Sequence, residues 1–245
     1  MTNRKKKVIE KQVPQCNTFS RIEDNKQTIT RLLSKSTTKR LNSFNWLRHE
    51  ISFTEPRTLF HVSAQQQAPY FDHSCTRGLG EAYDYILKRG IDKNPITFRD
   101  VCEIHYLLCN GTNIKINDTF IRAGVIKKTN VPLEIESKLV QIIDNCLASD
   151  KTPFIKAFDI HYQIILLQPF DDYNKRTARL VMNLILISNG YRPIAFTRKT
   201  DKKQYPSALL QMKQGNAKSY YRYMVNAMLA SQEKIINQLK TSKIK

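Results

Sequence analysis

Residues 168–179 decide the fold, and they read Gln168-Pro169-Phe170-Asp171-Asp172-Tyr173-Asn174-Lys175-Arg176-Thr177-Ala178-Arg179. This stretch is a polar loop that runs directly into an apolar helix predicted over 175–189. Pro169 disfavours the α conformation of the residue before it, so the preceding helix is predicted to end at Gln168. The chain therefore turns sharply between two helices and places several charged side chains in the turn.

The start of the helix after this loop is a predicted anion site. A helix N-terminus presents unpaired backbone N–H groups and about half a positive charge. Arg176 and Arg179 are three residues apart and share a helix face, so two guanidinium groups can clamp a polyphosphate. Asp172 offers a carboxylate to the Mg²⁺ that accompanies such a ligand. A solvated basic loop capped by an aspartate is the alternative, and spacing alone leaves both interpretations open.

Outward from the loop, apolar residues at helical spacing predict an all-α fold. Thr97 is a predicted N-cap, and Pro153 suits a first helical turn. The helix at 175–189 is apolar nearly all round, which predicts a central position. Alternation over Ile114–Val131 predicts a short β-hairpin. The predicted helices are 78–90, 98–108, 133–148, 153–167, 175–189, 202–215 and 218–238.

A chain of 245 residues can bury one substantial core, so one main domain with an appended piece is expected. We place the main domain at residues 78–245. Residues 1–77 are predicted to be a basic tail and a helical extension, which Trp46 anchors through its large apolar area.

The charge of the chain favours acidic or phosphate-bearing partners. Forty Lys and Arg residues against 21 Asp and Glu residues give a formal net charge of +19. Part of this charge lies in the two tails, and no zinc-finger, RNP or KH signature accompanies it, so nucleic acid is disfavoured as a partner.

Cysteine usage and hydropathy indicate a reducing, cytosolic setting. The five cysteines are scattered and form no CxxC pair that would suggest zinc or redox chemistry. No apolar run approaches the roughly 18 to 20 residues of a membrane span, and the basic N-terminus is not followed by the apolar stretch of a signal peptide.

The loop resembles the Fic motif, His-Pro-Phe-x-Asp/Glu-Gly-Asn-Gly-Arg-x-x-Arg. The likeness extends over roughly 78–228, and it identifies the chain as a member of the Fic (Fic/Doc, Fido) family with a degenerate motif. The fold implied is a Fic-like helical bundle with a short β-hairpin flap and an N-terminal helical extension. Five residues lie in register with the motif: Phe170, Asp172, Asn174, Arg176 and Arg179.

The resemblance implies a role for each of these residues. Phe170 would anchor the loop in the core, and Asp172 would coordinate Mg²⁺. Asn174, with neighbouring backbone amides, would form an anion hole. Arg176 would bind the α- and β-phosphates of ATP, and Arg179 would reach the terminal phosphate. The implied reaction transfers AMP from ATP to a Ser, Thr or Tyr hydroxyl of a target protein and releases pyrophosphate.

The segment that begins with Ile121-Arg122-Ala123-Gly124 resembles the start of the family's flap. In that family the flap docks the target as an added strand, through backbone hydrogen bonds. The resemblance therefore implies that a protein target docks on residues 121–130. The flap residues that carry this prediction are Ile121, Arg122, Ala123, Gly124, Val125 and Ile126.

Three residues depart from the motif. Gln168 stands where the family has its catalytic His, and an amide cannot take the hydroxyl proton, so a contribution of about 10² to 10⁴-fold should be missing. Tyr173 stands where Gly is usual and adds a side chain beside the phosphate path. Lys175 replaces the second Gly and resembles Doc-like relatives, which transfer phosphate by binding ATP the other way round.

We therefore expect an adenylyltransferase-like pseudoenzyme that binds ATP and Mg²⁺, with catalysis weak or lost. The alternatives are Doc-like transfer of phosphate to protein and a non-catalytic protein-interaction module. A homodimer stays open. The family prior is a bacterial cytosol, and export as a secreted effector stays open as well.

Overall fold

A computed structural model describes residues 16–34, 68–92, 94–116, 119–127, 132–196 and 198–241. The predicted anchoring by Trp46 and the far end of the predicted flap, residues 128–130, lie outside these described residues.

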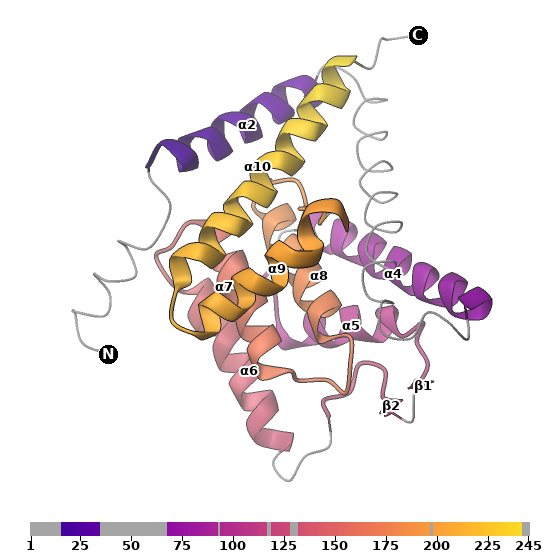
Figure 1. Cartoon of the computed structure of the whole chain (residues 1–245). Helices are drawn as coiled ribbons and strands as arrows, with labels where there is room; N and C mark the ends of the chain where they lie inside the picture. The colour runs from indigo at the N-terminus through magenta and orange to yellow at the C-terminus, as the bar shows by residue number, and fades with distance from the viewer. Residues whose placement is uncertain are drawn as a thin grey trace. The chain divides into compact units, whose positions relative to one another are not determined.

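Helices make up most of the described chain, which confirms the predicted all-α fold class. The elements are α2 (Cys16–Ser34), α4 (Ala68–Ile91), α5 (Phe98–Leu108), β1 (Ile114–Ile116), β2 (Thr119–Ile121), α6 (Pro132–Leu147), α7 (Pro153–Leu167), α8 (Asn174–Ser188), α9 (Arg198–Lys213) and α10 (Ala217–Thr241) (Figure 1). Helices α5 and α7 have the predicted bounds, and α4 starts well before the predicted residue 78. No helix within these ranges is apolar over the length that a bilayer crossing requires.

The strand pairing is shorter than the predicted hairpin over 114–131. Strands β1 and β2 are antiparallel, with Ile114 opposite Ile121 and Ile116 opposite Thr119. The ladder ends because the chain turns at residues 122–125, where Gly124 has a φ of +68° and the Val125 N–H donates to the Arg122 carbonyl at 3.4 Å. After this turn the backbone bonds to other parts of the fold.

The described elements fall into two compact units, and the first contains α4 to α8 with the hairpin. Helix α8 is its centre, since every residue from Arg176 to Leu186 is buried. This confirms the predicted central position of the apolar helix. Helix α4 approaches α8 so closely that a Cβ atom at Gly90 would lie 2.6 Å from the Ile187 side chain.

The second unit contains α2, α9 and α10. Helix α2 packs against α10 (Figure 1), where the Arg21 guanidinium pairs with the Glu233 carboxylate at 2.9 Å. The buried Gln232 amide donates to the Ile22 carbonyl at 3.2 Å. The predicted N-terminal extension is thus helical over Cys16–Ser34, while the predicted division at residue 77 remains a prediction.

A buried carboxylate fixes the start of α5. Asp100 is 3% exposed and accepts hydrogen bonds from the Thr97 N–H and the Arg89 Nε, each at 2.7 Å. The Tyr85 hydroxyl donates to the same carboxylate at 2.8 Å. Burial acts to raise the pKa of Asp100, but the hydrogen bonds from Thr97, Arg89 and Tyr85 outweigh it and lower the pKa below its ordinary value. Thr97 is the N-cap, as predicted.

We expect Asp100→Ala to lower the free energy of unfolding by about 1.5 to 3 kcal/mol, the scale of a hydrogen bond to a charged group. Urea unfolding at pH 7 measures the loss. Because the pKa of this carboxylate is depressed in the folded state, its contribution is present at neutral pH and is lost as the pH falls through that pKa. The gap between wild type and variant should therefore narrow in acid. Asp92→Ala, at an exposed position, is the control, and an equal loss in both variants would contradict this account.

Candidate functional site

The loop between α7 and α8 begins with a left-handed residue. Gln168 ends α7 with φ 47° and ψ 62°, and its N–H donates to the Ile164 carbonyl at 2.9 Å. The next residue is Pro169, which cannot continue the helix. The Gln168 side chain is exposed, and it makes no hydrogen bond to any part of the chain that the structure describes.

Asn174 closes the loop on itself. Its side-chain Oδ1 accepts the Phe170 N–H at 2.9 Å, and its Nδ2 donates to the Phe170 carbonyl at 2.9 Å. Phe170 is 1% exposed, so its ring lies in the core. The Asn174 amide thus uses its oxygen and one of its two N–H donors on the backbone of the loop, which leaves the second Nδ2 hydrogen and the backbone N–H groups for an anion.

His105, on α5, connects the loop to the segment after β2. The Gly124 N–H donates to its Nδ1 at 2.9 Å, so Nδ1 must be unprotonated and Nε2 must carry the proton. Nε2 then donates to the Asp172 carbonyl at 3.3 Å. The imidazole also stacks on the Phe170 ring, with centroids 3.9 Å apart and planes at 9°. Burial is the main reason that the pKa of His105 falls to about 4, while the Asp172 carbonyl and the Asp171 charge act to raise it.

Arg122 and Asp171 form a second connection. The Arg122 guanidinium donates to both carboxylate oxygens of Asp171, from Nε and from Nη2, each at 3.1 Å. The Arg122 N–H donates to the same carboxylate at 3.3 Å. A backbone hydrogen bond of 2.9 Å from Lys127 to the Pro169 carbonyl lies further along the same two segments.

Tyr173 shapes the start of α8. It is the N-cap residue in a left-handed conformation, φ 56° and ψ 10°, and its N–H donates to the Asp172 Oδ1 at 2.6 Å. Its ring is buried and lies under the Arg176 guanidinium, whose Cζ is 4.4 Å from the ring centroid. Such a contact is a cation–π interaction. The aromatic ring that we expected beside the phosphate path is thus packed against one of the two arginines.

Both motif arginines are buried on α8. Arg176 is 5% exposed and has no ion pair or hydrogen bond to the residues that the structure describes. Arg179 is 7% exposed and lies close enough to His161 to affect it. Burial, and secondly the Arg179 charge, lowers the pKa of His161 to about 3. Lys175, by contrast, points into solvent.

The first turn of α8 has free donors. No side chain caps this helix, and the first backbone bond of the turn runs from the Thr177 N–H to the Tyr173 carbonyl at 2.9 Å. Over the described residues no acceptor is recorded for the N–H groups of residues 174–176. Uncapped N–H groups, the helix dipole and a buried guanidinium are groups that can bind an anion.

Sequence reasoning missed three of these features. Asp171 falls at a position that the motif leaves unspecified, so nothing singled it out. His105 was not identified as a site residue, and its partners lie in two other segments. Arg122 was identified as a flap residue without its carboxylate partner. The one local signal that could have pointed to Asp171 is its charge at an unspecified position inside the motif.

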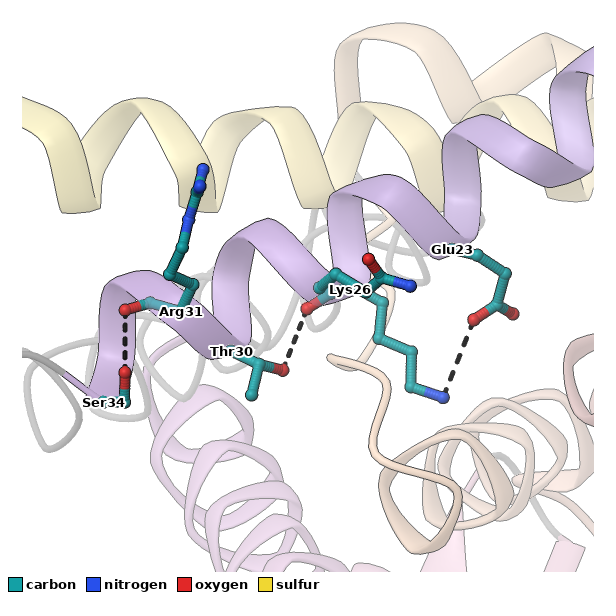
Figure 2. Close-up of a pocket in the computed structure, with 6 residues that line it drawn as sticks. Glu23, Lys26, Thr30, Arg31 and Ser34 are labelled. Atoms are coloured by element: carbon teal, nitrogen blue, oxygen red, sulfur yellow. Dashed lines mark hydrogen bonds and ion pairs between the residues drawn. The ribbon is translucent and has the colours of Figure 1, made fainter.

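A hollow of about 500 Å³ beside α2 is a weaker candidate. Figure 2 shows that its labelled residues all come from this one helix, and that the hydroxyls of Thr30 and Ser34 bind backbone carbonyls of the same helix. The Thr30 hydroxyl donates to the Lys26 carbonyl at 2.9 Å, and Lys26 pairs with Glu23 at 3.8 Å. The hollow is lined by Glu23, Lys26, Gln27, Thr30, Arg31 and Ser34.

Known proteins resemble this chain in sequence. Residues 95–186 match the model of the Fic/DOC family. A protein adenylyltransferase fic-1 of Caenorhabditis briggsae is 29% identical over 163 residues, which are 62% of this chain and 31% of that protein. A protein adenylyltransferase Fic of Nematostella vectensis is 29% identical over 180 residues, 65% of this chain and 40% of that protein. The chain thus spans well under half the length of these curated relatives.

Solved structures resemble it in fold. A Fic domain containing signaling protein from Bacteroides thetaiotaomicron has a TM-score of 0.77 at 17% identity, over 92% of this chain and 100% of that one. A fragment of Fic-1 from Caenorhabditis elegans has a TM-score of 0.67 at 19% identity, over 96% of this chain and 74% of that one. At these identities the likeness concerns the fold alone, and it confirms the Fic-like helical fold that the motif predicted.

Because His105 and His161 are held neutral, we expect the folded protein to lose stability in acid. Both have pKa values, about 4 and about 3, that lie below the ordinary value of 6.5. At pH values between 6.5 and the pKa of the folded state, the unfolded chain binds protons that the folded chain does not. The free energy of unfolding therefore falls as the pH decreases. From pH 7.5 to pH 5 the loss should be about 2 kcal/mol for each imidazole.

Urea unfolding across this pH range measures that loss. Nitrogen-15 NMR of His105 adds a direct check, since its Nδ1 should remain unprotonated and its Nε2 protonated down to about pH 5. An imidazole that titrates near its ordinary pKa would contradict the hydrogen bonds described for His105.

Proposed function

This chain carries a Fic/DOC-family domain over residues 95–186, and from this premise we propose that it is an adenylyltransferase-like protein that binds ATP while its transfer activity is weak or lost. The binding would be at the loop between α7 and α8, and the loss would follow from Gln168.

The main support for this proposal is the buried position of the Arg176 guanidinium and its lack of an ion pair among the described residues. A buried charge without an anionic partner is costly in an apolar surrounding. Arg176 is 5% exposed, its guanidinium lies over the Tyr173 ring, and it has no ion pair among the described residues. A phosphate group at the start of α8 would supply that partner, and the uncapped N–H groups of the first turn would bind the same anion. Arg179, on the same face, is the candidate for a second phosphate.

Magnesium fits this site as a companion of the nucleotide. The described residues contain no cluster of three or more His, Cys, Asp or Glu side chains that could hold a metal by themselves. Mg²⁺ commonly uses one or two carboxylates together with substrate phosphates and waters. Asp172 would provide the carboxylate, since it is exposed and one of its oxygens accepts only the Tyr173 N–H. When bound, the ion neutralises charge on the phosphates.

The step of AMP transfer for which Gln168 is unsuited is removal of the hydroxyl proton. In AMP transfer the target hydroxyl oxygen bonds to the α-phosphorus, the bond to pyrophosphate breaks, and the hydroxyl proton must pass to a base. The Gln168 amide cannot take this proton at neutral pH. His161, seven residues earlier on α7, is fully buried with a pKa of about 3, so it is no substitute.

The proposed docking segment for a protein target follows β2. Val125 is 50% exposed, and the N–H groups of Ala123 and Gly124 donate to Asn113 and His105. Most N–H donors of this segment are therefore used within the fold. A target strand would bind mainly by donating its own N–H groups to the carbonyls here, with Ile126 as the N–H donor that has no recorded acceptor in the described residues.

Restoring the histidine tests the transfer reaction. We expect Gln168→His to label protein in a cell extract with ATP labelled at the α-phosphate, and wild type to label it about 10² to 10⁴-fold more slowly. Label from the γ-phosphate would instead favour Doc-like phosphate transfer, for which the exposed Lys175 is the sequence signal. Absence of labelling alongside intact ATP binding would favour a non-catalytic interaction protein.

Removing the buried guanidinium tests the nucleotide site. We expect Arg176→Ala to weaken ATP·Mg²⁺ binding by about 1.5 to 3 kcal/mol in titration calorimetry. Arg222→Ala, at an exposed position on α10, is a matched control and should bind like wild type. If wild type binds no ATP at millimolar ligand, the proposed function fails.

A further inference from the structure

Two segments far apart in the chain are joined by more than packing. Residues 121–127 begin at the last residue of β2, and residues 168–174 run from the end of α7 to the first residue of α8. A bidentate ion pair, a shared imidazole and a backbone hydrogen bond connect them. These connections use charged side chains, backbone N–H groups and carbonyl groups of the two segments. The same kinds of group would otherwise be available to bind a target strand or an anion.

The Arg122–Asp171 ion pair is partly buried, so solvent weakens it less than it weakens a surface ion pair. The side chains of Arg122 and Asp171 are 16% and 18% exposed, which places them between a surface pair and a buried pair. Both guanidinium bonds measure 3.1 Å and reach different oxygens, a fork geometry that fixes orientation as well as distance. Because the Arg122 N–H binds the same carboxylate, Asp171 holds the backbone of the segment as well as its side chain.

The imidazole forms the second connection. His105 accepts the Gly124 N–H on one nitrogen and donates to the Asp172 carbonyl from the other. A shift of either segment breaks its bond to the ring and leaves a buried polar atom unpaired, which is costly.

Gly124 lies close against α5. Its φ is +68°, and a Cβ atom there would lie 3.0 Å from the Tyr106 Cβ and 3.1 Å from the Cys102 carbonyl oxygen. The segment is therefore in contact with α5 at the point where it binds His105. Further on, the Lys127 N–H to Pro169 carbonyl bond of 2.9 Å completes the connection.

We propose that Arg122, Asp171 and His105 are positioning residues that make the segment 121–127 and the loop 168–174 one cooperative unit, so that a target strand on the segment and a nucleotide at the loop bind with linked affinities. The linkage to ligands rests on the proposed function, whereas the cooperative unit is a property of the free protein. Linkage of this kind is reciprocal, so either ligand would raise the affinity for the other by the same factor.

Hydrogen exchange on the free chain of 245 residues tests the cooperative unit. Arg122→Gln should speed exchange of the Gly124 and Lys127 amides by about tenfold, the scale expected when a hydrogen bond to a charged group is lost. The same variant should speed exchange of the Phe170 and Tyr173 amides, across the contact, by a similar factor. Asp171→Asn should give the reciprocal result in both segments.

Two controls separate coupling from general loss of stability. Arg77→Gln removes the exposed Arg77–Glu81 pair on α4, which touches neither segment, and should leave all four amides unchanged. Amides in the centre of α8 report global opening, so the lost ion pair should speed their exchange by no more than the same factor. If Arg122→Gln changes only the amides of residues 121–127, the proposal is overturned.

Calorimetry with ATP·Mg²⁺ tests the linkage to the nucleotide. Arg122→Gln, which would not contact the nucleotide, should weaken binding by about tenfold, and the double variant with Asp171→Asn should bind no more weakly than the worse single variant. Independent, additive losses would overturn the linkage. If wild type binds no ATP, the proposed function fails, while the exchange experiment still decides whether the two segments form one unit.

Discussion

A neutral imidazole at position 105 is the constraint on which the loop depends. Only an unprotonated Nδ1 can accept the Gly124 N–H, and only the matching tautomer can donate to the Asp172 carbonyl. Burial on α5 keeps the ring in that state by lowering its pKa to about 4. The Phe170 ring of the loop stacks on this imidazole. The position of the candidate anion site therefore follows from the protonation of a residue that is not part of it.

Local patterns predicted much of the fold. The bounds of α5 and α7 follow from Thr97, Pro153 and Pro169, because caps and prolines act within one turn of the helix end that they mark. The hairpin was predicted too long, since alternation continues past Gly124 although the backbone there bonds to His105 and Pro169. A pattern of residue types does not specify which acceptor a backbone N–H will find.

The candidate site was harder to predict, for a related reason. Its charged residues were identified from the loop, but their environments depend on contacts between distant positions. Asp171 and Arg122 are 49 residues apart, and His105 and Asp172 are 67 apart, so no short-range spacing relates them. That Arg176 lies over the Tyr173 ring, and that the Asn174 amide is engaged with Phe170, are also results of three-dimensional packing.

The exposure of Gln168 bears on how readily this chain could change its chemistry over evolutionary time. The residue ends a helix in an open turn, and its side chain has no recorded bond to the described fold, so exchanging it for another residue requires no repacking. In the standard genetic code, glutamine and histidine codons share their first two bases. A third-position substitution therefore exchanges one for the other, and a lineage could gain or lose an imidazole here without passing through an unstable intermediate.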